Sequence, residues 1–147
     1  MDKKRIRISE LDPAAYKAMH GMEKYLNGTG LDKKLRELIK IRASQINGCA
    51  YCIDLHTKEA MEHGETPRRI FAISAWWESP LFNEAEKAAL KMTDEITLIA
   101  DQGLTRRSYE EAKRHFTDLE IAQIIMQVGV INVWNRIAVS TQMQHDK

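Results

Sequence analysis

Apolar side chains recur along most of the chain at the three- and four-residue spacing of amphipathic helices. Between residues 32 and 46, for example, Leu35, Leu38, Ile39 and Ile46 share one face of a helix. Few segments show the strict apolar–polar alternation of a half-buried β-strand. The pattern predicts an all-α fold, in which residues 1–147 form a single helical domain of about six to seven helices.

Capping and helix-breaking residues divide this pattern into individual helices. The predicted helix starts are Asp12-Pro13, about residue 32, Cys49 or Ala50, Thr66-Pro67, Asn83, Ser108 and Thr117. The predicted helix ends are Gly28, Asn47-Gly48, Gly64, Trp76-Trp77, about Asp101 and about Thr141. Asn83, Ser108 and Thr117 are each followed three residues later by a glutamate, as in a capping box.

The last predicted helix, from Thr117 to about Thr141, is apolar on more than one face. A helix that is apolar all round is buried. Because the chain has only 147 residues, we expect part of this burial to be against another copy. The sequence therefore predicts a homo-oligomer assembled through long apolar helices.

Composition and charge exclude several function classes. Apolar residues make up 44% and charged residues 29% of the chain, and the net charge is +1, with basic and acidic residues interleaved. The N-terminal residues lack the apolar core of a signal peptide, and polar side chains interrupt the longest apolar region, residues 121–139. We therefore expect a cytoplasmic protein that binds neither nucleic acid nor a membrane.

Two cysteines, Cys49 and Cys52, have C-x-x-C spacing and carry the candidate chemistry. In a reducing compartment this spacing indicates redox chemistry or metal binding. A helix has about 3.6 residues per turn. Cys49, Cys52 and His56 therefore share one face of a helix that starts at Cys49, with Cys52 and His56 one turn apart.

The start of a helix favours an anion such as a thiolate, because its N–H groups are unpaired. We expect both sulfurs at an exposed helix tip, where His56 exchanges a proton with Cys52 or with a bound oxygen. A carboxylate such as Glu37 would orient the imidazole. Periodicity alone does not select Glu37, since charged helical residues are mostly solvated.

Two alternatives stay open from the residues alone. Cys49, Cys52, His56 and Glu37 together offer the ligand types of a structural zinc site. The cysteines can also be two inert buried residues beside a helix-capping turn.

The sequence resembles the alkylhydroperoxidase D-like (AhpD-like) branch of the carboxymuconolactone decarboxylase superfamily. The resemblance covers roughly residues 31–139 and rests on Glu37, the run 44–52 with its cysteines, His56, and the segments 77–82, 84–90 and 132–138. It implies an all-α fold, often assembled as trimers or hexamers, with no cofactor and no metal.

The resemblance also implies a thiol-dependent peroxidase that reduces alkyl hydroperoxides and hydrogen peroxide in antioxidant defence. Cys52 attacks the peroxide, Cys49 resolves the sulfenic acid as a redox-active disulfide, and His56 and Glu37 relay protons. An external thiol or dithiol reductant protein then restores the cysteines.

One position departs from the founding members of this branch, which carry a histidine immediately before the second cysteine where this chain has Tyr51. A relay through that histidine is absent here. The alternative function is a general dithiol–disulfide oxidoreductase that acts on a protein or small disulfide through the same residues. Lactone decarboxylation is not expected, because the decarboxylase branch generally lacks the C-x-x-C pair.

Overall fold

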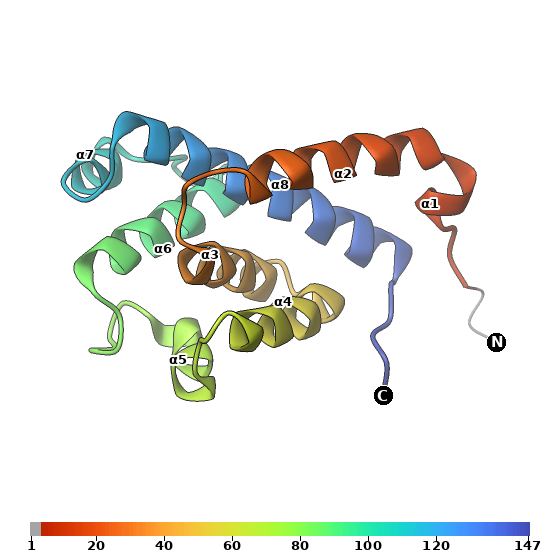
Figure 1. The fold of residues 1–147 in the computed structure, drawn as a ribbon, viewed down its shortest axis with the longest axis horizontal. Coiled ribbons are helices and arrows are strands. Elements are labelled where there is room, and N and C mark those ends of the chain that lie inside the picture. Colours follow the sequence, from red (N-terminus) through yellow and green to blue (C-terminus); the bar gives the residue numbers. More distant parts are fainter. Residues whose placement is uncertain (1–3) are drawn as a thin grey trace.

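The capping residues of the sequence set most of the helix boundaries. A computed structural model describes residues 4–147 (Figure 1). Its elements are α1 (Ile8–Leu11), α2 (Pro13–Asn27), α3 (Lys33–Ile46), α4 (Ala50–Glu62), α5 (Pro67–Ala72), the 3-10 helix η1 (Ile73–Ala75), α6 (Glu84–Thr97), α7 (Arg106–Lys113) and α8 (Asp118–Thr141). Residues 4–147 contain no β-strand, which confirms the all-α prediction.

Helix α3 is the centre of the fold, and α4, α6 and α8 all pack against it (Figure 1). Two apolar clusters fill the spaces around it. One joins α3 to α6 and α8 through Leu35, Ile39, Met92, Ile124 and Val128, among others. The other lies beneath α4, α5 and η1 and includes Leu38, Ile41, Ala60, Ile73 and Leu90. Because α3 is enclosed on most sides, its polar side chains are buried as well.

A buried amide network fixes the C-terminal end of α3 against α8. The side-chain amide of Asn47 donates hydrogen bonds to the side-chain oxygens of Asn135 at 2.9 Å and Asn132 at 3.0 Å. Asn135 in turn donates to the hydroxyl of Ser44 at 3.0 Å. Buried polar groups need partners of this kind. The network therefore holds the turn that precedes the two cysteines.

Three boundaries differ from the sequence prediction. Helix α1 was not predicted, because it is a single turn of four residues without a side-chain cap. The cap of α7 is Thr105 and not Ser108, since the hydroxyl of Thr105 accepts the N–H of Ser108. Helix α6 ends at Thr97 and not near Asp101, because the chain makes turns there and Gly103 adopts a positive φ of 66°.

Helix α8 is long and apolar, as predicted, but it is only partly covered in one chain. Its inner face is buried, whereas Leu119, Ile125, Met126, Val133 and Val139 are exposed. The homo-oligomer stays a prediction. Within residues 4–147, no helix combines the length and apolar character needed to cross a membrane.

Candidate active site

A single turn ends α3 and positions the first cysteine. The N–H of Cys49 donates to the carbonyl of Ser44 at 3.0 Å, and the N–H of Gly48 donates to that of Gln45 at 3.2 Å. This pair of bonds is a Schellman motif, which needs a residue with positive φ. Gly48 supplies it with φ of 64° at no steric cost. The chain therefore reverses direction just before Cys49.

Cys49 is the N-cap of α4, and its sulfur accepts the backbone N–H of Cys52 at 3.3 Å. The two side chains, called here the cysteine pair, form a disulfide with their Cα atoms 5.3 Å apart. A sulfur in this position lies at the positive end of the helix dipole. When the disulfide is reduced, the capping N–H favours the thiolate form of Cys49.

The cysteine pair is buried, contrary to the prediction of an exposed helix tip. Cys49 is 1% and Cys52 3% exposed, and they cluster with Ala138, Tyr51 and Met143. Of these, Met143 belongs to the C-terminal tail, residues 142–147, which leaves α8 on the side where α3 turns into α4 (Figure 1). The tail has no apolar periodicity, so the sequence pattern gave no sign that it packs on the cysteine pair.

One turn further along α4, the imidazole of His56 meets two carboxylates. Its Nδ1 lies 3.0 Å from Oε2 of Glu59 and 3.5 Å from Oε2 of Glu37. Glu59 follows on α4 itself, whereas Glu37 comes from α3. The shorter contact is a hydrogen bond, while Oε2 of Glu37 has no hydrogen-bond partner. The antiparallel packing of α3 and α4 thus brings both predicted residues, Glu37 and His56, together.

A lysine completes this group, which we call the charge cluster: Glu37, Lys40, His56 and Glu59. The Nζ of Lys40 lies 2.7 Å from Oε1 of Glu37 and 3.8 Å from Oε2 of Glu59. The side chains of Lys40 and Glu37 are only 8% and 3% exposed. Buried charges persist only when they are paired. Lys40 is therefore the partner that lets Glu37 stay ionised inside the protein.

The cluster shifts the pKa values of Glu37, His56 and Glu59 in the direction that keeps each of them charged. Burial by itself would raise the pKa of Glu37, but contacts with His56 and Lys40 outweigh it, and the pKa is lowered. Burial would likewise lower the pKa of His56, but Glu37 and Glu59 outweigh it, and the pKa is raised. The pKa of Glu59 is lowered, chiefly by its hydrogen bond to His56.

The predicted site residues form two groups on neighbouring turns of α4. Among residues 4–147, no hydrogen bond joins the imidazole of His56 to either sulfur in the disulfide form. Glu59 and Lys40 were not predicted. Glu59 stands three residues after His56, a spacing that places two side chains side by side on a helix. Lys40 stands at the same spacing from Glu37, so both pairings could have been found from the sequence.

Ligand atoms of Glu37, His56 and Glu59 lie within 4.8 Å of one another, as a metal site requires. However, the ammonium group of Lys40 already supplies positive charge between the two carboxylates and would repel a divalent cation. The zinc site considered from the sequence is not assembled either. The cysteine pair is a disulfide, which lacks thiolate ligands, and Nδ1 of His56 faces carboxylates.

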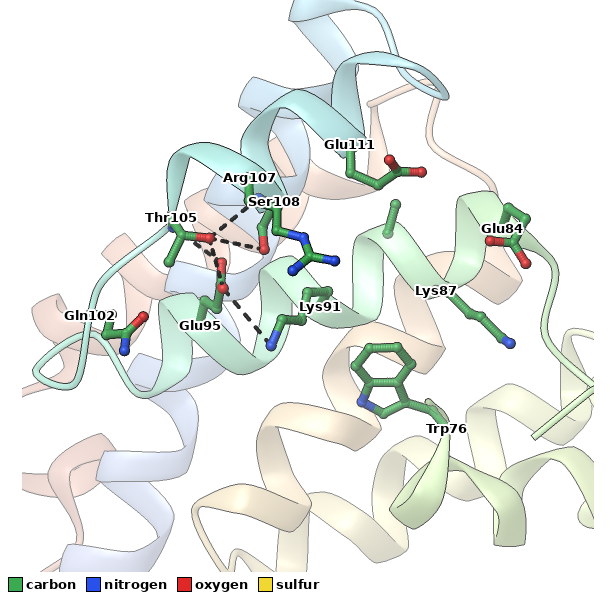
Figure 2. A pocket seen from close by; sticks show the side chains of 11 residues that line it. Trp76, Glu84, Lys87, Lys91, Glu95, Gln102, Thr105, Arg107, Ser108 and Glu111 are labelled. Atoms are coloured by element: carbon green, nitrogen blue, oxygen red, sulfur yellow. Dashed lines mark hydrogen bonds and ion pairs between the residues drawn. The ribbon is translucent and has the colours of Figure 1, made fainter. Parts of the chain in front are cut away.

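A pocket with a volume of about 700 Å³ lies elsewhere, between α6 and α7. Figure 2 shows its lining of charged side chains, with Lys91 directed to Glu95 and Glu95 bonded to Thr105. The lining contains three glutamates, two lysines and one arginine, so its acidic and basic charges balance. The pocket holds neither the cysteine pair nor any member of the charge cluster, so we do not assign the chemistry to it.

Comparison with known proteins decides the family. The family model of the carboxymuconolactone decarboxylase family matches residues 13–95, which contain the cysteine pair and the charge cluster. The chain belongs to this family. The uncharacterised protein YdfG of Bacillus subtilis is 39% identical to this chain over 136 residues, or 92% of each chain.

Solved structures place the chain in the AhpD-like branch of the carboxymuconolactone decarboxylase family. ATU0492 of Agrobacterium tumefaciens, a protein of unknown function with a provisional assignment to the antioxidant defence protein AhpD, is 42% identical with a TM-score of 0.95 over 99% of both chains. The debrominase Bmp8 is 21% identical with a TM-score of 0.83, over 93% of this chain and 74% of its own. At that identity Bmp8 shares the fold alone.

Proposed function

We propose that the protein is a thiol-dependent peroxidase that reduces hydrogen peroxide and alkyl hydroperoxides in antioxidant defence. The observation that carries this proposal is the cysteine pair at the start of α4, with a histidine one turn later that two carboxylates hold. The provisional AhpD assignment of ATU0492 supports the same chemistry. An external thiol or dithiol protein is the proposed electron donor, and the cytoplasm is the proposed location of the protein.

In the first step, the Cys52 thiolate attacks one peroxide oxygen and the O–O bond breaks. The products are a Cys52 sulfenic acid and an alkoxide or hydroxide, which takes a proton and leaves as an alcohol or water. The raised pKa of His56 makes its imidazolium available as the proton donor. Proton transfer of this kind contributes roughly 10²–10⁴-fold to a rate.

In the second step, Cys49 attacks the Cys52 sulfur, hydroxide leaves as water, and the disulfide forms. Two thiols have then lost two electrons and the peroxide has gained them. The N–H of Cys52 that caps the Cys49 sulfur supports this step, since it favours the thiolate form of Cys49. An external dithiol then reduces the disulfide through a mixed disulfide with one of the two sulfurs.

The burial of the cysteine pair favours a small substrate over a bulky one. With Cys49 and Cys52 at 1% and 3% exposure, a hydroperoxide group can approach after a small displacement of the tail. A protein disulfide, as in a general dithiol–disulfide oxidoreductase, requires a larger opening. This comparison supports the peroxidase as the main candidate.

The test is peroxide consumption by the reduced protein, its Cys49→Ser and Cys52→Ser variants, and Ser140→Ala, at an exposed position of α8, as a control outside the pair. We expect the wild type to consume one equivalent of cumene hydroperoxide per chain and to form the Cys49–Cys52 disulfide. Cys49→Ser should consume one equivalent and stop as a sulfenic acid that dimedone traps, whereas Cys52→Ser should consume none.

Two results would contradict the proposal. If Cys52→Ser keeps the wild-type rate, the attacking residue is wrong. If the wild type reduces a small disulfide such as hydroxyethyl disulfide far faster than any hydroperoxide, the protein is a dithiol–disulfide oxidoreductase and not a peroxidase.

A further inference from the structure

Two carboxylates approach the same nitrogen of His56, but their surroundings differ. The side chain of Glu37 is 3% exposed and lies 3.5 Å from Nδ1, whereas that of Glu59 is 38% exposed and lies 3.0 Å from it. Only the Glu59 contact has the geometry of a hydrogen bond. The two acids are therefore not equivalent partners of the imidazole.

Lys40 explains the difference. Its ammonium group is 2.7 Å from Oε1 of Glu37, which makes these two residues an ion pair within α3. A carboxylate whose charge is shared with an adjacent ammonium attracts a proton less strongly. Glu37 thus shares its charge between Lys40 and His56, while the nearest cation to Glu59 is His56 itself.

We propose that Glu59, in addition to Glu37, is a positioning residue that orients His56 for its work on the cysteine pair. This inference rests on the proposed function and adds a residue to it. Glu59 holds the proton on Nδ1, because a carboxylate at 3.0 Å accepts an N–H and cannot donate one when ionised. The Nε2 atom is then the nitrogen that accepts and returns a proton on the reacting side.

The Glu37–Lys40 pair differs from Glu59 in its surroundings. This ion pair is buried, carries little net charge and lies beside the imidazole of His56. Its other neighbour is His63, whose Nδ1 lies 3.8 Å from Oε1 of Glu37. The groups that face His56 are thus Glu37 and Lys40 from α3 and Glu59 from α4. Of these, only Glu59 is open to water, so salt screens its contact more than the buried pair.

The test uses the reduced full-length protein and three variants: Glu59→Gln, Glu59→Asp and, as a matched control, Glu62→Gln, which removes an exposed carboxylate from the same helix. Two quantities are measured across pH. One is the NMR titration of the His56 ring, and the other is the rate at which iodoacetamide alkylates Cys52 in a Cys49→Ser background. Neither measurement requires peroxidase activity.

For Glu59→Gln we expect the His56 titration to move to lower pH and the pH profile of alkylation to move with it. The peroxide rate should fall by on the order of tenfold, a part of the general acid contribution. Glu59→Asp should restore part of the shift, and Glu62→Gln should match the wild type. The circular dichroism melting curve of each variant verifies that it folds.

The inference is overturned if Glu59→Gln leaves both the His56 titration and the alkylation profile unchanged. It is also overturned if Glu37→Gln, tested in parallel, produces the full shift alone. These results are distinct from a failure of the proposed function, which would show as a wild type that does not consume peroxide while its His56 titration still depends on Glu59.

Discussion

The Nζ atom of Lys40 lies 2.7 Å from Oε1 of Glu37, and both side chains are almost entirely enclosed by the protein. Replacing Lys40 with methionine keeps most of the length of the side chain but leaves the Glu37 carboxylate with only the imidazoles of His56 and His63 nearby. Breaking a buried pair in this way costs roughly 3 kcal/mol of unfolding free energy. Urea denaturation of Lys40→Met measures the loss, with the exposed Lys33→Met as control. A change below about 0.5 kcal/mol, the range of surface substitutions, would contradict the pairing.

The charge cluster predicts how stability depends on pH. Because the pKa of His56 is raised above 6.5, its contribution is complete below pH 6.5 and is lost as the pH rises through the folded-state value. Because the pKa of Glu37 is lowered below 4.5, its contribution is complete above pH 4.5 and is lost as the pH falls through the folded-state value. The cluster therefore stabilises the fold most between pH 4.5 and 6.5.

Urea unfolding curves test this window when their midpoints are measured from about pH 3 to about pH 9, in steps of about half a pH unit. His56→Gln should flatten the alkaline side of the curve and leave a fall at acid pH. An identical alkaline slope in His56→Gln and the wild type would show that another group causes it.

The C-terminal tail predicts how fast the disulfide reacts with small thiols. Met143 packs on the cysteine pair, and its N–H is bonded to the carbonyl of Ala138 at 2.9 Å. Met143→Ala removes about 1 kcal/mol of covering contacts, so reduction by dithiothreitol should be about fivefold faster. The exposed Gln144→Ala is the matched control. Equal rates in Met143→Ala and the wild type would show that the tail does not limit access.

The amide network predicts a cost at a neutral, buried position. Asn135→Ala removes one of the two acceptors of the Asn47 amide and the donor to the hydroxyl of Ser44, so that the partly buried Asn47 and the buried Ser44 each lose a partner. The expected loss of unfolding free energy is about 2 kcal/mol. Thermal or urea unfolding measures it, with Ser140→Ala on the exposed face of α8 as control. A loss no larger than that of the control would contradict the network.

Local signals in the sequence predicted most of the fold. The capping box of Thr117 with Glu120 is present at the start of α8, and Pro67 is the first residue of α5, as expected. These features act within one helical turn, so the residues that create them are adjacent in the sequence. Thr105 and Ser108 are both good caps one turn apart, and the choice between them depended on Glu95, which bonds Thr105 from α6.

The candidate site was predicted less completely, because its decisive contacts join separate elements. Glu37 was selected by resemblance, and only the packing of α3 against α4 shows why it is buried beside His56. Glu59 is an exception, since it stands three residues after His56 on the same helix and its pairing could have been found from the sequence. Cys49 and Cys52 are buried against Ala138 of α8 and Met143 of the tail, and no periodic pattern encodes the position of the tail.

The turn that joins α3 to α4 has a consequence for how this chain can vary in length. Since a helix advances about 100° per residue, one added residue between Ile46 and Cys49 would rotate α4 by more than a quarter of a revolution relative to α3. This rotation would move His56 out of contact with Glu37, although no side chain of the site would be lost. Homologous chains that keep this chemistry should therefore vary in composition here but not in spacing.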